Sequence, residues 1–113
     1  MSTVNGVDFD EVIDQALLAA RAVVTENWDQ LEDIVAHIGE GLVSDVAFIA
    51  KKKKSGEFNE EDARVFLEDQ KLLARMRLRS VAIVTLQLAE RIWRAIADVF
   101  SRAINSALGW SLL

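Results

Sequence analysis

The chain contains no proline among its 113 residues and only five glycines, and this shortage of turn residues limits the folds it can adopt. β-Sandwiches, barrels and loop-rich enzymes need frequent turns, which depend on these two residue types. Apolar residues make up 51% of the chain and charged residues 27%, as is typical of a globular protein. The sequence therefore predicts a single all-α domain over residues 1–113.

Cysteine is also missing from the chain. Its absence excludes a disulfide framework, cysteine-ligated zinc or iron–sulfur sites and a cysteine nucleophile. We expect a cytoplasmic protein, because this composition fits a reducing compartment. The first residues have neither a basic region nor an apolar run, so we expect no signal peptide. The longest uncharged apolar stretch, residues 80–89, is about half as long as a transmembrane segment, so none is expected.

Capping residues mark two helix starts. Asp8 and Glu11 have the spacing of a capping box, and Asn59 is a typical N-cap residue followed by three acids. The helix dipole favours acids in the first turn. Between these starts, the lysines at 51–54 and the pair Ser55-Gly56 indicate the end of one helix and a turn.

Apolar residues on both sides of this turn recur every three or four positions, as in amphipathic helices. This period predicts a helix over 8–54, a turn at 55–58 and a helix over 59–108, which together form a long antiparallel hairpin. The stretch 80–88 is rich in β-branched residues, which favours a strand. We nevertheless predict helix there, because no turn residue bounds the stretch and the helical period runs through it.

The first helix has two places where it could break. Residues 25–27 could end one helix and cap another. The glycines at 39 and 41 could form a kink, since each costs about 1 kcal/mol relative to alanine within a helix. A chain of three helices, at about 8–24, 27–53 and 59–108, is therefore the alternative to the hairpin.

The helices at the end far from the turn carry more apolar surface than a two-helix hairpin can cover. Residues 80–108 have a second apolar stripe beside the first, and the facing part of the first helix is also apolar on more than one side. Large exposed apolar patches normally mark interfaces, so we expect the hairpin to complete a bundle by self-association into a dimer or tetramer. Folding back into three helices would bury the same surface within one chain. The predicted interface consists of Leu17, Val24, Trp28, Ile83, Leu86, Trp93, Ile96, Phe100 and Ile104.

Charge is unevenly distributed along the chain. Residues 1–50 carry a net charge of −9 and residues 51–113 carry +4, for a formal total of −5. A negative total argues against nucleic-acid binding. We expect the two halves to pack against each other, with the basic cluster Arg75, Arg77 and Arg79 lying across from Asp33 and Glu40.

The sequence contains no glycine-rich phosphate loop and no nucleophile motif, so we expect neither enzymatic activity nor a cofactor. Asp33, His37 and Glu40 are spaced i, i+4 and i+7 on one helix face and form a weak candidate metal site. An exposed acidic stripe with a solvated histidine accounts for the same three residues without a metal.

These observations predict a non-enzymatic helical bundle that acts by self-association and protein–protein interaction. The alternative is a bundle that binds a small ligand or a metal, with a pocket among Trp28, Trp93 and Phe100. The lysines at 51–54 are expected to form a solvated helix end, with an acidic partner or RNA as the functional alternative.

Overall fold

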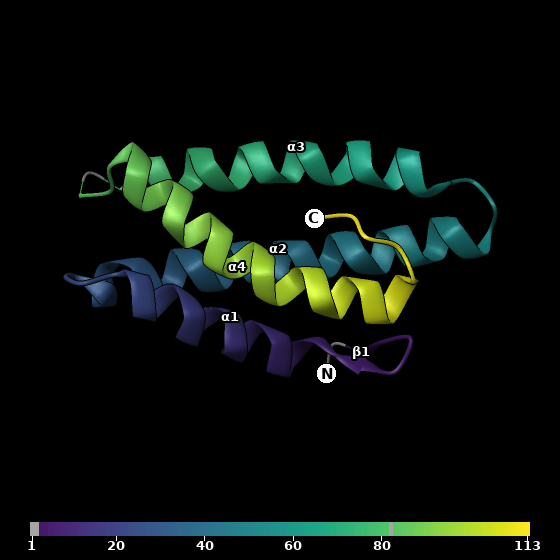
Figure 1. Ribbon diagram of the computed structural model, residues 1–113, viewed down its shortest axis with the longest axis horizontal. Helices are drawn as coiled ribbons and strands as arrows, with labels where there is room; N and C mark the ends of the chain where they lie inside the picture. Colours follow the sequence, from purple (N-terminus) through teal and green to yellow (C-terminus); the bar gives the residue numbers. More distant parts are fainter. Residues whose placement is uncertain (1–2, 82) are drawn as a thin grey trace.

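The computed structural model describes residues 3–81 and 83–113, and in this part of the chain four helices pack into a bundle (Figure 1). The bundle measures 44 × 25 × 18 Å, and the predicted all-α fold is confirmed. A short antiparallel ribbon precedes the first helix. The elements are β1 (Thr3–Val4), β2 (Val7–Asp8), α1 (Phe9–Val23), α2 (Trp28–Lys54), α3 (Glu60–Arg79) and α4 (Leu86–Leu108).

The four helices have unequal surroundings. In Figure 1, α1 lies along the lower edge of the bundle and α3 along the upper edge, with α2 and α4 between them. The central helix α4 contacts α1, α2 and α3, whereas α3 packs on α2 and α4. One side of α3 is therefore left without a neighbouring helix.

The predicted continuous helix over 59–108 is wrong, because α3 ends at Arg79 and α4 begins at Leu86. Two hydroxyl side chains satisfy backbone groups at this break. The Ser80 Oγ donates to the carbonyl oxygen of Arg77 at 2.6 Å, and the Thr85 Oγ1 accepts from the backbone N–H of Leu88 at 3.1 Å. Most residues between the two helices are β-branched and have low helix propensity, so leaving the helix here costs little. The break lets α4 turn back into the bundle.

The first predicted helix is also divided, at one of its two expected places. α1 ends at Val23 and α2 begins at Trp28, with Asn27 in the left-handed region at φ 62°. There is no break at 39–41, where α2 continues through both glycines. Gly39 is buried against α1, and a Cβ atom there would lie 3.5 Å from Cγ1 of Ile13. The predicted three-helix alternative therefore places this boundary correctly and misses the one after Arg79.

The N-cap residues lie where the sequence predicts them, but the capping box expected from Asp8 and Glu11 forms only its Asp8 half. The Asp8 carboxylate accepts from the backbone N–H groups of Asp10 and Glu11 at the start of α1. At the start of α3, Asn59 and Asp62 form a reciprocal capping box, with distances of 2.8 and 3.1 Å. The turn after α2 also follows the predicted position, because α2 ends at Lys54 and α3 starts at Glu60.

The β1–β2 ribbon was not predicted, although its turn sequence is a strong hairpin signal. Asn5 and Gly6 have φ values of 48° and 85°, and Asn-Gly is the preferred pair for a two-residue hairpin turn. The Asn5 Nδ2 donates to the carbonyl oxygen of Ala107 at 2.8 Å, which ties the ribbon to the end of α4.

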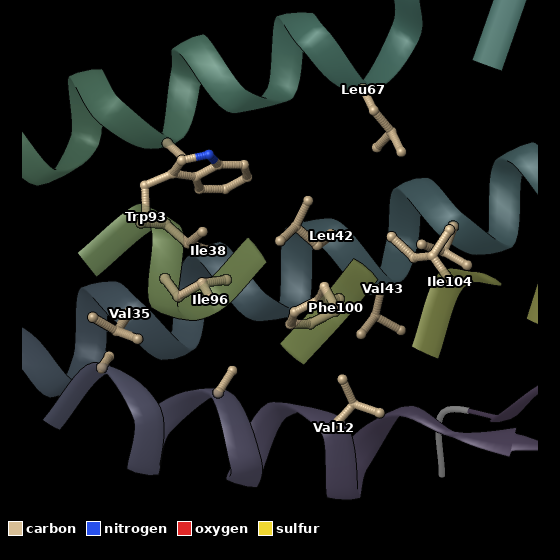
Figure 2. Close-up of a cluster of buried hydrophobic side chains, with 14 of the residues drawn as sticks. Val12, Val35, Ile38, Leu42, Val43, Leu67, Trp93, Ile96, Phe100 and Ile104 are labelled. Atoms are coloured by element: carbon tan, nitrogen blue, oxygen red, sulfur yellow. The ribbon is translucent and has the colours of Figure 1, made fainter. Parts of the chain in front are cut away.

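The hydrophobic core is built around α4. Figure 2 shows Trp93, Ile96, Phe100 and Ile104 of α4 lying among side chains of α1, α2 and α3. The Phe100 ring stacks on Phe9 with centroids 6.1 Å apart.

This packing corrects much of the predicted interface between copies. Five of its nine residues are buried in the core of the single chain, because α4 turns back against α1 and covers its own second stripe. They therefore present no free surface to another copy. These five residues are Val24, Trp93, Ile96, Phe100 and Ile104.

Within residues 3–81 and 83–113, no helix is both long enough and apolar enough to cross a membrane.

Candidate interaction surface

The outer face of α3 carries an apolar stripe that no other helix covers. Its inner face is buried through Ala63, Leu67, Ala74 and Leu78. The outer face exposes Val65, Leu72, Leu73 and Met76, which are half of the large exposed hydrophobic residues in the described part of the chain. Val65, Leu72 and Met76 are separated by seven and four positions and therefore line up along the helix. We call these four residues the α3 stripe.

Charge on α3 is divided between its two halves. Residues 60–69 contain five acids and one base, which gives a net charge of −4. Residues 70–79 contain four bases and no acid, which gives +4. The α3 stripe therefore runs from an acidic half, which holds Val65, into a basic half, which holds Leu72, Leu73 and Met76.

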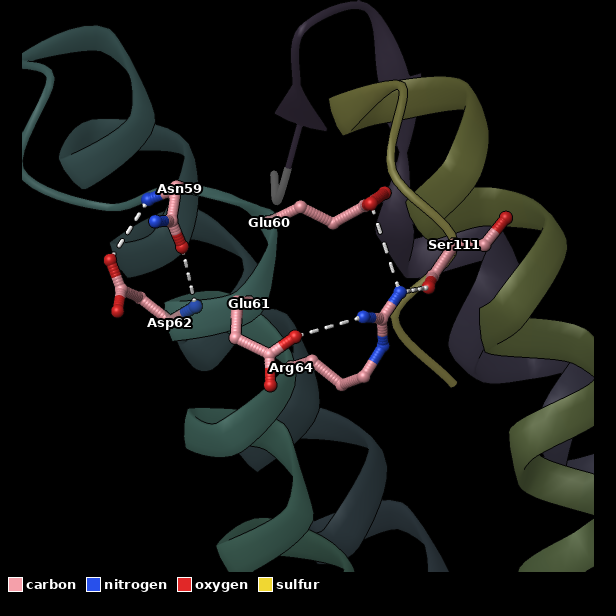
Figure 3. A network of polar contacts seen from close by, with 6 residues as sticks. All are labelled: Asn59, Glu60, Glu61, Asp62, Arg64 and Ser111. Carbon is pink, nitrogen blue, oxygen red and sulfur yellow. Dashed lines mark hydrogen bonds and ion pairs between the residues drawn. The ribbon is translucent and has the colours of Figure 1, made fainter.

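Part of the acidic half is engaged at the start of the helix (Figure 3). Asp62 serves the capping box with Asn59. Arg64 lies 3.8 Å from Glu60 and 3.5 Å from Glu61, and its Nη2 also donates to the carbonyl oxygen of Ser111 at 3.1 Å. Glu68 and Asp69 form no ion pair with other described residues, and both are exposed. Glu68 lies beside the α3 stripe, whereas Asp69 lies on the stripe itself, one turn from Val65 and from Leu72.

The basic half does not pair as the sequence predicts. Arg75 forms an ion pair with Glu90 of α4, with Nη2 and Oε1 2.8 Å apart. Arg77 interacts electrostatically with Asp45 of α2. Asp33 and Glu40 form no ion pair with the described residues, so the expected pairing of the arginine cluster with these two acids is wrong. Arg79 is exposed and has no ion-pair partner in the same part of the chain.

Asp45 lies in the seam between α2 and α3. It is half-buried and shares a small crevice with Gln70, Ala74 and Arg77. Burial raises the pKa of Asp45 from 3.8 to about 6, and the positive charge of Arg77 partly offsets this increase. The carboxyl group therefore titrates nearer to neutral pH than an exposed aspartate.

An aromatic cluster stands near the turn between α2 and α3. The Phe48 ring lies 5.2 Å from Phe66 and 5.9 Å from Phe58, measured between centroids. Phe58 precedes the N-cap of α3, where a hydrophobic residue fixes the entry of the chain into the helix. This cluster holds the start of α3 against α2.

Two of the four lysines at 51–54 have intramolecular partners rather than forming only a solvated helix end. The Lys52 Nζ pairs with Glu57 at 2.9 Å and lies 5.4 Å from the Phe48 ring centroid. The Lys53 Nζ donates to the carbonyl oxygen of Leu108 and lies 4.5 Å from the Trp110 ring centroid. With Arg64, Lys53 therefore helps to fix the chain that follows α4.

The candidate metal residues Asp33, His37 and Glu40 are all exposed on α2. No group of three or more histidine, aspartate or glutamate side chains in residues 3–81 and 83–113 is arranged to hold a metal ion. The geometry therefore gives the candidate metal site no support.

The predicted pocket among Trp28, Trp93 and Phe100 does not form. Phe100 is fully buried in the core. Trp93 lines a cavity of about 270 Å³ between α3, α4 and the chain after α4, together with Arg64, Lys71 and Leu112. Trp28 lines a separate open depression of about 300 Å³ between α1 and α2.

Four residues of the predicted interface retain exposed surface. Leu17 and Trp28 are partly exposed in the depression between α1 and α2. Ile83 and Leu86 are exposed and follow α3 along the chain. None of the four belongs to the α3 stripe, which the sequence prediction missed. The signal was present, because Val65, Leu72 and Met76 repeat at helical spacing on a face that the predicted core does not use.

No protein-family model matches this sequence, and neither the curated proteins nor the solved structures provide a match.

Proposed function

We propose that this chain is a non-enzymatic helical-bundle protein that acts by self-association and protein–protein interaction, and that the α3 stripe is its contact surface. The observation that carries this proposal is the concentration of large exposed apolar side chains on one helix. Met76 is 67% exposed, Val65 57% and Leu72 54%. A cytoplasmic location, expected from the lack of cysteine, remains part of the proposal.

Burial of the α3 stripe provides the driving force for association. Complete burial of a leucine, valine or methionine side chain contributes about 1.5–3 kcal/mol. Exposed apolar patches with charged residues around them are typical of protein interfaces, and in the α3 stripe one acid, Asp69, also lies between Val65 and Leu72. The stripe lies on a regular helix held by α2 and α4, so little conformational entropy is lost when it is covered.

The test is the concentration dependence of the mass of the full chain, measured by sedimentation equilibrium. The Leu72→Gln/Met76→Gln double variant removes two apolar contacts from each copy without changing charge. We expect association to weaken on the order of 100-fold, because four side chains that are only about half exposed, two from each copy, together lose about 3 kcal/mol of apolar burial.

The matched control is Leu18→Gln, since Leu18 is 69% exposed but lies on α1. It should associate as the wild-type chain does. A wild-type chain that stays monomeric, or a double variant that associates as tightly as wild type, would refute the proposal.

A second candidate function is binding of a small amphipathic anion in the cavity beside Trp93. This cavity combines apolar walls from Trp93 and Leu112 with the cationic groups of Arg64 and Lys71, and the carboxylate of Glu68 also lines it. Titration calorimetry with decanoate should then give saturable binding that Lys71→Glu weakens about tenfold. Equal heats from the wild-type and variant chains would exclude this site.

A further inference from the structure

We infer that the partner on the α3 stripe is a second copy of this chain, docked with its α3 antiparallel to the first. This inference rests on the proposed function, which already includes self-association, and adds the orientation and register of the two copies. Two features of α3 carry it: the opposite charges of its two halves, and the position of the charged residues that flank the stripe.

The charge division selects the antiparallel orientation. Residues 60–69 carry −4 and residues 70–79 carry +4. Antiparallel packing places the acidic half of each copy on the basic half of the other, whereas parallel packing would place like charges together. Because the two contacts are identical by two-fold symmetry, one α3 supplies both complementary surfaces.

The flanking residues give the pairing a specific form. Glu61, Glu68 and Arg75 are seven positions apart, and Arg79 lies one turn beyond Arg75, so all four follow the same side of the α3 stripe. When a two-fold axis runs perpendicular to the two α3 helices, each side of one α3 lies next to the same side of the other. The two glutamates of one copy therefore lie on the side of the two arginines of the other, where Arg79 has no ion-pair partner among the described residues and Arg75 is already paired with Glu90 of its own chain.

One pair of apolar residues fits the same register. Centring the two helices near residue 70 brings Val65 of one copy beside Met76 of the other, whereas Leu72 of each copy comes opposite Asp69 of the other. It also brings Glu61 of one copy beside Arg79 of the other. The α3 helix has 20 residues and is about 30 Å long, so this contact runs along the whole exposed side of the helix.

Two single charge reversals test the orientation. In its own homodimer, Glu61→Lys would place one lysine beside each Arg79, and Arg79→Glu would place one glutamate beside each Glu61. Each reversal should weaken homodimer formation about tenfold, with a smaller effect in high salt. An equimolar mixture should recover wild-type affinity as a heterodimer, because both contacts then join opposite charges.

Matched controls are Glu40→Lys on α2 and Arg102→Glu on α4, which are exposed sites away from α3. Neither should change association, alone or mixed. Native mass spectrometry distinguishes homodimers from heterodimers if one variant is labelled with nitrogen-15. Circular dichroism melting checks that each variant remains folded.

The outcomes separate this inference from the proposed function. Weak reversal homodimers and a restored heterodimer support the antiparallel pair. If the Leu72→Gln/Met76→Gln variant fails to associate while both reversals associate as wild type does, the orientation is wrong and the surface is right. If the wild-type chain is monomeric at all concentrations, both the inference and the proposed self-association are wrong.

Discussion

The third and fourth helices differ in what covers their apolar residues. α4 has two apolar stripes and contacts three other helices, so Ile96, Phe100 and Ile104 are fully buried. α3 also has apolar residues on two faces, but it lies at one edge of the bundle and exposes the second face. The comparison shows that position in the bundle, and not apolar content alone, decides which residues form core and which form surface.

The largest difference in stability should come from placing an aspartate on α4 in one variant and on α3 in another. Phe100→Asp puts a carboxylate into the core and should destabilise the fold by about 4 kcal/mol or more. Met76→Asp changes an exposed position and should cost about 0.5 kcal/mol or less at low concentration, where the chain is monomeric. Urea unfolding followed by circular dichroism measures both. Similar losses for the two variants would show that α3 is covered within the chain.

A smaller loss of stability should follow from removing the side-chain cap that starts α4 after the break from α3. Thr85→Ala removes the side-chain cap of α4, which should cost about 1 kcal/mol. Thr85→Ser keeps the hydroxyl group and is the control. Thermal unfolding distinguishes the two, and equal stability of the alanine and serine variants would show that the cap is not needed to start α4.

The smallest effect is a pH-dependent change in stability caused by Asp45, which lies in the seam between α2 and α3. Because burial raises the pKa of Asp45 from 3.8 to about 6, the folded state binds this proton more tightly than the unfolded state does. The associated stability is present below about pH 3.8 and is lost as pH rises through 6.

Asp45→Asn removes this titration and should gain stability relative to wild type between pH 4 and 7. After allowance for the partial exposure of the carboxyl group, the gain should be about 1 kcal/mol or less. Urea unfolding across this range measures it. A difference in unfolding free energy between the wild-type and Asp45→Asn chains that stays constant over this pH range would show that Asp45 does not titrate here. Asp33→Asn, on the exposed face of α2, is the control.

Local signals predicted much of the fold. Asp8 and Asn59 begin helices because their side chains accept hydrogen bonds from free N–H groups of the first turn, and this chemistry involves only neighbouring residues. The turn after Lys54 is local for the same reason. Two further local signals were misinterpreted: Asn5-Gly6, which forms the hairpin turn, and the β-branched run before Leu86, which interrupts the helix.

The candidate surface was less predictable, because it depends on where the helices pack. Periodicity shows that a helix has apolar faces but does not say which face another helix will cover. Phe100 and Ile104 were therefore predicted at an interface and lie in the core. Leu72 and Met76 were outside the predicted interface and are exposed.

The sequence by itself determined that the chain is helical, where two of its helices begin and how charge is distributed along α3. These properties follow from capping, composition and residue order, which do not depend on distant contacts. Only the tertiary structure decided that α4 occupies the centre and α3 the edge. The break between Arg79 and Leu86 reverses the chain, and the helices then bury the apolar faces that can reach one another. The α3 stripe is exposed because no fifth helix in the described chain reaches it.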